Sequence, residues 1–357
     1  MTKQVDCGGV KIGGGAPVSI QSMTNTDTRD VKGTLAQIDR LADAGCQIVR
    51  CAVPDAEAAE ALRAIKASSR LPVVADIHFD HRLALAALAA GADKIRINPG
   101  NIGGRDKIKA VVREAKTHGA PIRVGVNGGS LERGILEKYG GVTAEAAAES
   151  ALAHVRLLTD LDFEDIVVSV KLSDVVRNHA AHVLAAGMTD RPFHIGLTEA
   201  GVGRGGEIKS AVGAGALLLA GIGDTLRVSL TGDPVREVLL AAEILKSLRL
   251  REGGAQVIAC PTCGRCRVDL ESLALAVERR LREAEKRAAG LLPAISVAVM
   301  GCAVNGPGEA ACADIGVACG DGKGVIFQKG KIMRTVREED IADELMKGVE
   351  ALWILGC

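Results

Sequence analysis

Residues 94–127 read KIRINPGNIGGRDKIKAVVREAKTHGAPIRVGVN, and the order of apolar and charged segments in this stretch decides the fold. Two short apolar runs, Lys94–Asn98 and Pro121–Asn127, flank a charged segment with helical spacing at Ile108–Thr117. Apolar runs of this length indicate buried strands, and the segment between them indicates a helix. A strand, a helix and a second strand joined in this way form a βαβ unit with parallel strands.

The same pattern recurs from residue 17 to about residue 250, where eight strand-like runs alternate with helical segments. After the eighth run, Asp233 and Pro234 suit the N-cap and the first position of a helix. Eight alternating units favour an α/β fold of the (β/α)8 TIM-barrel type, with an open doubly wound sheet as the structural alternative. The runs are Val18–Met23, Gln47–Val53, Leu71–Ile77, Lys94–Asn98, Pro121–Asn127, Asp165–Lys171, His194–Glu199 and Thr225–Leu230.

The pattern changes after residues 251–254, which read REGG. A cysteine-rich run, a long charged helix at Leu270–Ala289 and a closing helix at Glu338–Leu352 are expected beyond this point. Strand-like runs lie between the two helices, at Ile295–Met300, Asp314–Ala318, Val325–Lys329 and Lys331–Val336. We therefore expect two domains, a barrel at residues 1–250 and a small α+β domain at residues 251–357.

Composition narrows the classes of function. The chain has 357 residues, with 44 Lys and Arg balanced by 44 Asp and Glu, so no overall field attracts nucleic acid or an anionic membrane. Aromatic residues make up only 2%, which leaves few platforms for stacking bases. The first residues lack the apolar run of a signal peptide, and the longest uncharged apolar stretch, Ala211–Gly223, is too short to span a bilayer. A cytoplasmic protein without nucleic-acid or membrane partners is expected.

Polar and charged residues gather at the carboxyl ends of the predicted strands, where barrel enzymes place their active sites. Residues two apart in a strand share a face, so several of these cations are expected to converge at the barrel mouth. Guanidinium groups bind phosphate through paired hydrogen bonds, which indicates a substrate with two or more phosphate charges. The residues are Arg50, Asp76, His78, Arg96, Asn98, Arg123, Asn127, Lys171, Glu199, Arg227 and Ser229.

The inward carboxylates Asp76 and Glu199 are too few to neutralise so many cations through salt bridges. Glu199 is a candidate general acid or base at the end of the seventh strand. Asp76 and His78 form a second candidate pair, for which proton transfer and hydrogen-bonded positioning of the substrate both stay open.

Two loops need interpretation. Residues 128–141, GGSLERGILEKYGG, follow the fifth strand, and a mobile lid and a static helical turn both stay open. Gly201, Gly203 and Gly206 spell GxGxxG, but they follow the seventh strand of eight, and Asp224 stands before the next strand instead of at its end. We therefore favour an anion-contacting or flexible loop over a dinucleotide site.

Six of the ten cysteines lie within sixty residues near the C-terminus, at Cys260, Cys263, Cys266, Cys302, Cys312 and Cys319. Cysteines clustered in a reducing cytosol indicate metal or redox chemistry more than disulfides. Zinc sites usually present two CxxC or CxxH pairs, whereas this chain has one CxxCxxC run and no histidine after His194. An iron–sulfur centre fits better. Spacing alone leaves the ligands beyond the first two open among the other four cysteines.

Eight motifs together carry a resemblance. They are QSMTNT (21–26), ADIHF (75–79), RINPGNIG (96–103), GVNGGSLE (125–132), GLTEAG (196–201), GIGDTLRVSL (221–230), CPTC (260–263) and GCAVNGPGEA (301–310). In these motifs the chain resembles the 4-hydroxy-3-methylbut-2-enyl diphosphate synthase family over nearly its whole length. The resemblance implies a [4Fe–4S] cluster, and Cys266 does not match a family ligand. The implied cluster ligands are Cys260, Cys263, Cys302 and Glu309.

The resemblance also implies substrate-binding residues at Arg50, Arg96, Arg123, Asn127, Lys171 and Ser229, with Glu199 as the acid or base. The implied reaction is the reductive ring opening and dehydroxylation of 2-C-methyl-D-erythritol 2,4-cyclodiphosphate, a step of isoprenoid precursor biosynthesis. It implies flavodoxin or ferredoxin as electron donor, and a homodimer whose active site lies between the barrel and the cluster domain of different subunits. The alternative is a non-redox phosphosugar isomerase or aldolase barrel with a zinc-binding appendage.

Overall fold

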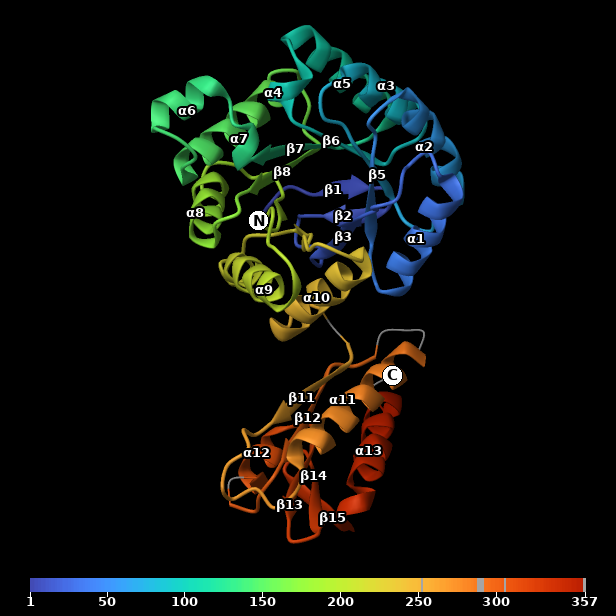
Figure 1. Ribbon diagram of the computed structural model, residues 1–357, viewed down its shortest axis with the longest axis vertical. Helices are drawn as coiled ribbons and strands as arrows, with labels where there is room; N and C mark the ends of the chain where they lie inside the picture. The colour runs from blue at the N-terminus through green and yellow to red at the C-terminus, as the bar shows by residue number, and fades with distance from the viewer. Residues whose placement is uncertain (252, 288–291, 305, 356–357) are drawn as a thin grey trace. The chain divides into compact units, whose positions relative to one another are not determined.

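A computed structural model describes residues 1–251, 253–287, 292–304 and 306–355. The chain divides into two compact units, Met1–Arg251 and Glu252–Cys357 (Figure 1). Among the residues that the structure describes, none of the helices combines the length and the apolar character needed to cross a bilayer.

The first unit is built on a sheet of eight strands whose hydrogen-bonded neighbours are all parallel, in the order β8-β7-β6-β5-β4-β3-β10-β9. A parallel bridge between Val168 on β8 and Phe193, just before β9, brings the two edges together. The predicted TIM-type barrel is therefore confirmed, and the open sheet is excluded. The strands are β3 (Ser19–Met23), β4 (Ile48–Ala52), β5 (Val73–Asp76), β6 (Lys94–Ile97), β7 (Ile122–Asn127), β8 (Ile166–Lys171), β9 (His194–Ile195) and β10 (Thr225–Leu226).

Helices surround the strands (Figure 1) because the outward face of each strand is apolar. Val49, Ile95 and Val124 point outward and are buried in one core with helix residues such as Leu62 and Val111. The helices are α1 (Val31–Asp43), α2 (Ala56–Ser68), α3 (His81–Ala89), α4 (Pro99–Ile102), α5 (Arg105–His118), α6 (Arg133–Tyr139), α7 (Ala144–Thr159), α8 (Val175–Ala186), α9 (Gly203–Leu219) and α10 (Pro234–Ser247).

Side chains cap many of these helices. The Asp233 carboxylate accepts a hydrogen bond from the Val235 backbone N–H, with Pro234 in the first turn of α10, as the sequence predicts. Asp30, Asp55 and Asp174 cap α1, α2 and α8 in the same way. These caps fix the residue at which each of the four helices begins.

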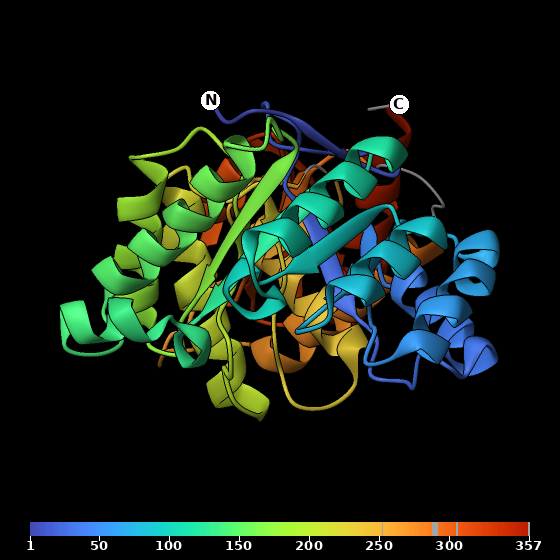
Figure 2. The ribbon, with the colours of Figure 1, turned by 90° about the horizontal axis from the view of Figure 1, so that it is seen from above.

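A hairpin of β1 (Val5–Cys7) and β2 (Val10–Ile12) crosses one end of the barrel (dark blue in Figure 2). Its buried side chains pack against barrel residues near the amino ends of their strands, in a small cluster of Val5, Cys7, Ile12, Ile48, Val74 and Val167. This apolar plug closes the amino end of the barrel, so the polar interior opens toward the carboxyl ends of the strands.

The last two barrel strands are shorter than predicted. The runs His194–Glu199 and Thr225–Leu230 contribute only His194–Ile195 and Thr225–Leu226 to the ladder. Strand β9 ends directly before Gly196, whose φ of 149° lies in a region that glycine alone adopts readily. A Cβ atom at Gly196 would lie 2.2 Å from the Arg227 carbonyl oxygen, so a residue with a side chain does not fit here.

The second unit is a sheet in the order β11-β12-β13-β14-β15, parallel from β11 to β13 and antiparallel beyond. Helices α11 (Leu270–Arg287) and α13 (Ile341–Leu355) contribute to a core with Val297 and Val317, and α12 (Gly306–Cys312) packs against Ala298 and Met300. The predicted α+β domain is confirmed, although residues 288–289 of its predicted long helix lie outside the described residues. The strands are β11 (Ala255–Ala259), β12 (Ile295–Met300), β13 (Ile315–Gly320), β14 (Lys323–Gln328) and β15 (Lys331–Arg337).

Candidate functional site

The interior of the barrel is unusually polar. Strand side chains alternate between the two faces, so the apolar outward residues leave the residues between them to point inward. Six cations and the two buried carboxylates Asp76 and Glu237 lie in this interior, which leaves a formal excess of four positive charges. The cations are Arg50, Lys94, Arg96, Arg123, Lys171 and Arg227.

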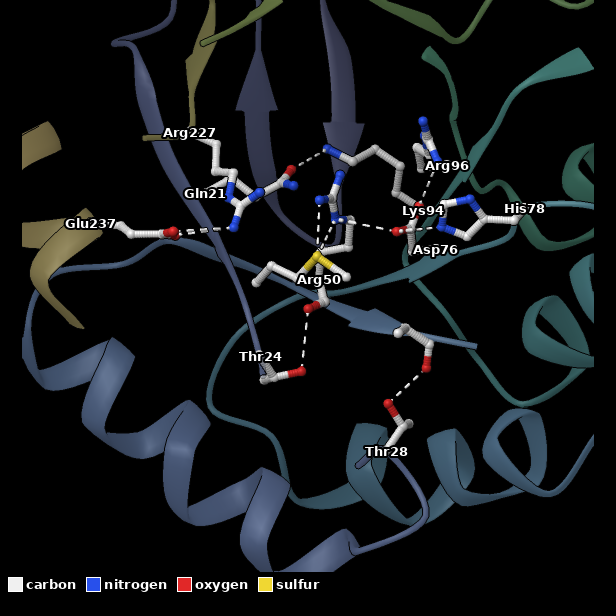
Figure 3. Close-up of polar contacts among 12 residues, drawn as sticks. Gln21, Thr24, Thr28, Arg50, Asp76, His78, Lys94, Arg96, Arg227 and Glu237 are labelled. Atoms are coloured by element: carbon white, nitrogen blue, oxygen red, sulfur yellow. Dashed lines mark hydrogen bonds and ion pairs between the residues drawn. The ribbon is translucent and has the colours of Figure 1, made fainter. Parts of the chain in front are cut away.

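Asp76, at the end of β5, is the centre of one group of contacts (Figure 3). Its carboxylate lies 3.2 Å from Arg96 Nη1, 3.8 Å from Arg50 Nε and 3.3 Å from His78 Nε2. Burial alone would raise the pKa of Asp76, but Arg50, the His78 hydrogen bond and Arg96 outweigh burial and hold that pKa well below its ordinary value. Asp76 is therefore a carboxylate at neutral pH, and it orients two guanidinium groups and one imidazole.

The remaining donors of these arginines lack good acceptors. Arg50 directs Nε and Nη2 toward the thioether sulfur of Met23, at 3.2 and 2.9 Å, and a thioether is a weak acceptor. Within the described residues, Arg96 Nε, Arg227 Nε and both Nε and Nη1 of Arg123 are buried without a hydrogen-bond partner. Buried donors are almost always satisfied in folded proteins. Their concentration here indicates a site for an anionic ligand with several acceptor oxygens.

Two glycines make room for these cations. A Cβ atom at Gly125 on β7 would lie 2.6 Å from Arg96 Nε, and one at Gly196 would lie 3.0 Å from Lys171 Nζ. Any larger residue would therefore push the guanidinium or the ammonium group out of its present position.

The predicted site residues divide into those that the fold brings together and those that it leaves apart. Arg96 and Arg123 are register partners on β6 and β7, and Asn127 and Lys171 are register partners at the ends of β7 and β8. Ser229 is half-buried beyond β10. Glu199 is exposed with a left-handed φ of 53°, and in the described part of the chain neither Glu199 nor Ser229 forms a hydrogen bond or ion pair.

Two charged interior residues, Glu237 and Lys94, were not among the predicted site residues. Glu237 on α10 lies 3.2 Å from Arg227 Nη2 and accepts hydrogen bonds from Ser22 Oγ and the Leu230 backbone N–H. Lys94 donates to Gln21 Oε1 at 3.4 Å (Figure 3). The alternation of residues 94, 96 and 98 places Lys94 inward and could have identified it. Glu237 reaches the interior from a helix, so no strand pattern predicts it.

Residues 128–141 form a short 3-10 turn, Gly128–Ser130, and helix α6. Glu132 between them lies 2.6 Å from His154 Nε2 and accepts a hydrogen bond from Ser150 Oγ at 2.7 Å. Tyr139, at the end of α6, donates to Glu149 at 2.6 Å. These contacts attach both ends of the segment to α7. A lid that moves independently of α7 would first have to break them.

The predicted cluster ligands of the second unit lie on neighbouring elements. Cys260 follows β11 and Cys302 follows β12, and because these strands are parallel and paired, both residues lie at the same sheet edge. The Gly301 backbone N–H donates to Cys260 Sγ at 3.4 Å. Cys263 is exposed in the loop after β11, and Glu309 is exposed on α12. Asn305, within the GCAVNGPGEA motif, lies outside the described residues, as does Cys357.

Of the other described cysteines of this unit, Cys266 has a local partner, Cys319 is buried and Cys312 is exposed on α12. The Cys266 thiol donates to the Val268 carbonyl oxygen at 3.3 Å and packs against the domain core. Burial raises the pKa of Cys319 to about 12, which disfavours the thiolate that metal binding requires. A backbone hydrogen bond from Arg265 lowers the pKa of Cys263, which favours its thiolate. Cys263 therefore has more of the character of a ligand than Cys319.

The donors available at this edge suit an iron–sulfur centre. Thiolates are the usual ligands of such clusters, and a carboxylate is a harder, more easily displaced oxygen ligand. Across the described ranges, however, no three His, Cys, Asp or Glu side chains already converge as metal ligands. The chemistry and the sheet edge fit the group, and the assignment of Cys260, Cys263, Cys302 and Glu309 stays a prediction.

Comparisons with known proteins agree with both units. Residues 2–242 match the family described as the GcpE TIM-barrel domain, and residues 256–351 match the GcpE protein C-terminal domain. The barrel also resembles a solved dihydropteroate synthase from Yersinia pestis, with a TM-score of 0.50 and 12% identity over 70% of this chain and 99% of that one. At that identity the likeness concerns the fold alone.

Curated relatives are much more similar. A 4-hydroxy-3-methylbut-2-en-1-yl diphosphate synthase (flavodoxin) from Geobacter sulfurreducens is 56% identical over 351 residues, covering 98% of each chain. A protein of the same name from Caldicellulosiruptor saccharolyticus is 55% identical over 353 residues, covering 99% of each chain. Both matched domains and both full-length relatives place the sequence in one group, and the chain belongs to the GcpE family.

Proposed function

We propose that this chain is an iron–sulfur oxidoreductase that converts 2-C-methyl-D-erythritol 2,4-cyclodiphosphate to 4-hydroxy-3-methylbut-2-enyl diphosphate. The reaction consumes two electrons and two protons, opens the ring at a C–O bond and releases one oxygen as water. The observation that carries the proposal is the buried set of cations whose N–H donors lack partners. A diphosphate supplies the negative charge and the several acceptor oxygens that such donors need.

In this proposal Arg50, Arg96, Arg123 and Lys171 bind the diphosphate, with Asn127 and Ser229 adding neutral hydrogen bonds at the rim. The weak Arg50–Met23 contact supports the role of Arg50, because phosphate oxygen is a far better acceptor than sulfur. Asp76 forms ion pairs with Arg50 and Arg96 and holds both guanidinium groups in place. These side chains therefore need to move little when the substrate binds.

Proton delivery is assigned to Glu199, with the Asp76–His78 pair as a second proton-handling group. His78 Nε2 faces the Asp76 carboxylate at 3.3 Å, so Asp76 orients the imidazole at the rim. Glu199 is exposed, and its backbone adopts a conformation that is costly for a residue other than glycine. Such strain is common at functional positions.

Cys260, Cys263, Cys302 and Glu309 would hold a [4Fe–4S] cluster. When bound, this group supplies electrons one at a time and an iron with an exchangeable oxygen ligand. The relatives' printed name includes flavodoxin, and we propose flavodoxin or ferredoxin as the electron donor. We also propose a homodimer, in which the active site lies between the barrel of one subunit and the cluster domain of the other.

The alternative, a non-redox isomerase or aldolase barrel with a zinc appendage, is not favoured, because the family covers both units of the chain. The test is anaerobic purification with metal and sulfide analysis, followed by assay with the cyclodiphosphate and reduced flavodoxin. The proposal expects about four iron and four sulfide per chain, together with formation of the linear diphosphate. A colourless zinc protein, or a cluster-loaded protein that leaves the cyclodiphosphate unchanged, would overturn it.

A further inference from the structure

Lys94 lies in the barrel interior without a role in the proposed chemistry. It lies on β6, two residues before Arg96, and its side chain is fully buried. It donates a long hydrogen bond, 3.4 Å, to Gln21 Oε1 and also interacts with the neutral Cys7 thiol. The Gln21 amide nitrogen beside it is also buried without a partner.

Lys94 lacks a balancing negative charge. The Asp76 carboxylate is engaged by Arg50, Arg96 and His78. Asp93, the neighbour of Lys94 in sequence, pairs instead with Lys66 at 2.7 Å. Among the described residues, no carboxylate forms an ion pair with Lys94 or with Lys171.

Apart from the carboxylates of Asp76 and Glu237, which are paired with arginines, the groups around Lys94 in the barrel interior add positive charge or none. The polar and charged groups of the interior are Cys7 on β1, Gln21 on β3, Arg50 on β4, Asp76 on β5, Arg123 on β7, Lys171 on β8, His194 on β9, Arg227 just after β10 and Glu237 on α10. Burial raises the pKa of the Cys7 thiol, although Lys94 acts in the opposite direction, so Cys7 is neutral at ordinary pH. Burial and the surrounding cations lower the pKa of His194 well below its ordinary value, so this imidazole is neutral too.

Among the cations of the interior, only the two buried lysines, Lys94 and Lys171, can lose a proton readily, and burial lowers the pKa of both. Guanidinium groups keep their protons in proteins, whereas a buried ammonium group loses its proton readily. Lys171 is a predicted phosphate contact at the rim. Lys94 lies deeper, above the hairpin that plugs the barrel, where water cannot screen its charge.

We propose that Lys94 is uncharged in the substrate-free barrel and takes up one proton from solvent when the diphosphate binds. The negative charge of the ligand then replaces the missing carboxylate, and the ammonium adds to the field that holds the diphosphate. Burial, with Arg123 and Arg50, lowers the pKa of Lys94, in agreement with the geometry. The inference rests on the proposed function, because it takes the cyclic diphosphate as the ligand.

Proton uptake by Lys94 would make binding of the cyclic diphosphate depend on pH, which can be measured. The cyclic diphosphate has no phosphate proton to release near neutral pH, so protons taken up on binding must go to the protein. At pH values between the pKa of Lys94 in the free enzyme and its pKa in the complex, binding weakens as the pH increases. The dissociation constant of the cyclic diphosphate should then rise by up to about tenfold for each added pH unit. Because Lys94 acts through the field and not by contact, it is a positioning residue for the bound diphosphate.

The experiment is calorimetric titration of the anaerobic holoenzyme with the cyclodiphosphate at pH 7.5 to 8.5, in two buffers with different heats of ionisation. We expect net proton uptake, of which about one proton disappears in Lys94→Met. Lys109→Met, on the exposed face of α5, is the matched control and should keep the wild-type uptake. Equal uptake in wild type and Lys94→Met, or binding with no buffer dependence, would overturn the inference. A complete lack of binding by the wild type would instead overturn the proposed function.

A second measurement keeps the inference testable if Lys94→Met does not fold. In wild-type protein labelled with 13C at the lysine ε-carbon, the chemical shift of that carbon reports the charge of each lysine. A buried lysine signal should be neutral at pH 8, become charged when the cyclodiphosphate is added, and persist in Lys171→Met. If all lysine signals of the substrate-free enzyme are those of charged ammonium groups, Lys94 does not take up a proton.

Discussion

Arg96 and Gly125 are neighbours across β6 and β7, and the guanidinium group of Arg96 fills the space that a side chain at position 125 would need. A Cβ atom there would lie 2.6 Å from Arg96 Nε. Gly125→Ala should therefore displace the guanidinium group and raise KM for the cyclodiphosphate about 10-fold or more, because one charge-assisted contact is misplaced. Gly215→Ala, on α9 with open space around it, is the control and should leave KM unchanged. A wild-type KM in a folded Gly125→Ala enzyme would show that the position of Arg96 is unimportant.

The barrel cations should act mainly through binding and positioning of the substrate. Alanine substitution of Arg50, Arg96, Arg123 or Lys171 removes a charge-assisted contact worth typically about 1.5–3 kcal/mol. Because a tenfold change corresponds to about 1.4 kcal/mol, kcat/KM should fall roughly 10- to 150-fold for each residue. Steady-state kinetics, with the cluster content of every variant measured first, tests this range. A variant with normal kcat/KM would remove its residue from the phosphate site.

Glu199→Gln should behave differently from the cation variants. Gln nearly conserves size and still forms hydrogen bonds, but it cannot transfer a proton, so kcat should fall by about 10²–10⁴ with little change in KM. Glu199 is exposed, and within the described part of the chain no ion pair joins it to the barrel cations. The kinetics of this variant therefore test a role that the contacts of Glu199 do not themselves indicate. Near-normal kcat in a variant with full cluster content would remove Glu199 from the mechanism.

The four predicted cluster ligands should be separable from Cys266 by substitution. Cys302→Ser and Glu309→Ala should lose or alter the cluster and its turnover, whereas Cys266→Ser should be much milder. The physical reason is the hydrogen bond of the Cys266 thiol to Val268 and its packing in the core, which suit a structural residue. Iron content and anaerobic absorption spectra decide the matter. Equal iron loss in Cys266→Ser and Cys302→Ser would restore Cys266 as a ligand.

Glu132 should make the barrel sensitive to acid. Its hydrogen bond with His154 is the main cause of a pKa near 2, below its ordinary value of 4.5. Because the pKa is depressed in the folded state, the stabilisation is fully present above about pH 4.5 and is lost as the pH falls toward 2. Thermal unfolding at several pH values should show Glu132→Gln less stable than wild type at pH 6, with the difference shrinking below pH 4.5. Glu137→Gln, an exposed residue of the same segment, should show no such difference.

Much of the fold follows from sequence because each barrel strand is a short apolar run with polar residues at its carboxyl end. The runs around Arg50, Arg96 and Arg123 carry both features, so the strands and the cationic mouth could be predicted together. Strand β9 is shorter than its run and ends before Gly196, whose close approach to the Arg227 carbonyl is a contact made only in the folded barrel. Glu237 escaped prediction for a similar reason, since it enters the interior from a helix.

The cluster ligands could not be assigned from the spacing of the cysteines alone. Spacing within CxxCxxC treats Cys260, Cys263 and Cys266 alike, and only the resemblance separates Cys266 from the others. The fold adds a physical distinction, because Cys266 turns toward Val268, whereas Cys260 lies beside Cys302 at one sheet edge.

The hairpin of β1 and β2 has a kinetic consequence. Its side chains Val5, Cys7 and Ile12 form an apolar plug at the amino end of the barrel. The cationic interior is therefore a chamber that is closed at this end. Whatever occupies the chamber must leave through the opening by which it arrived. In the proposed reaction the product would therefore have to leave through the carboxyl end of the barrel before the next substrate could enter by the same route.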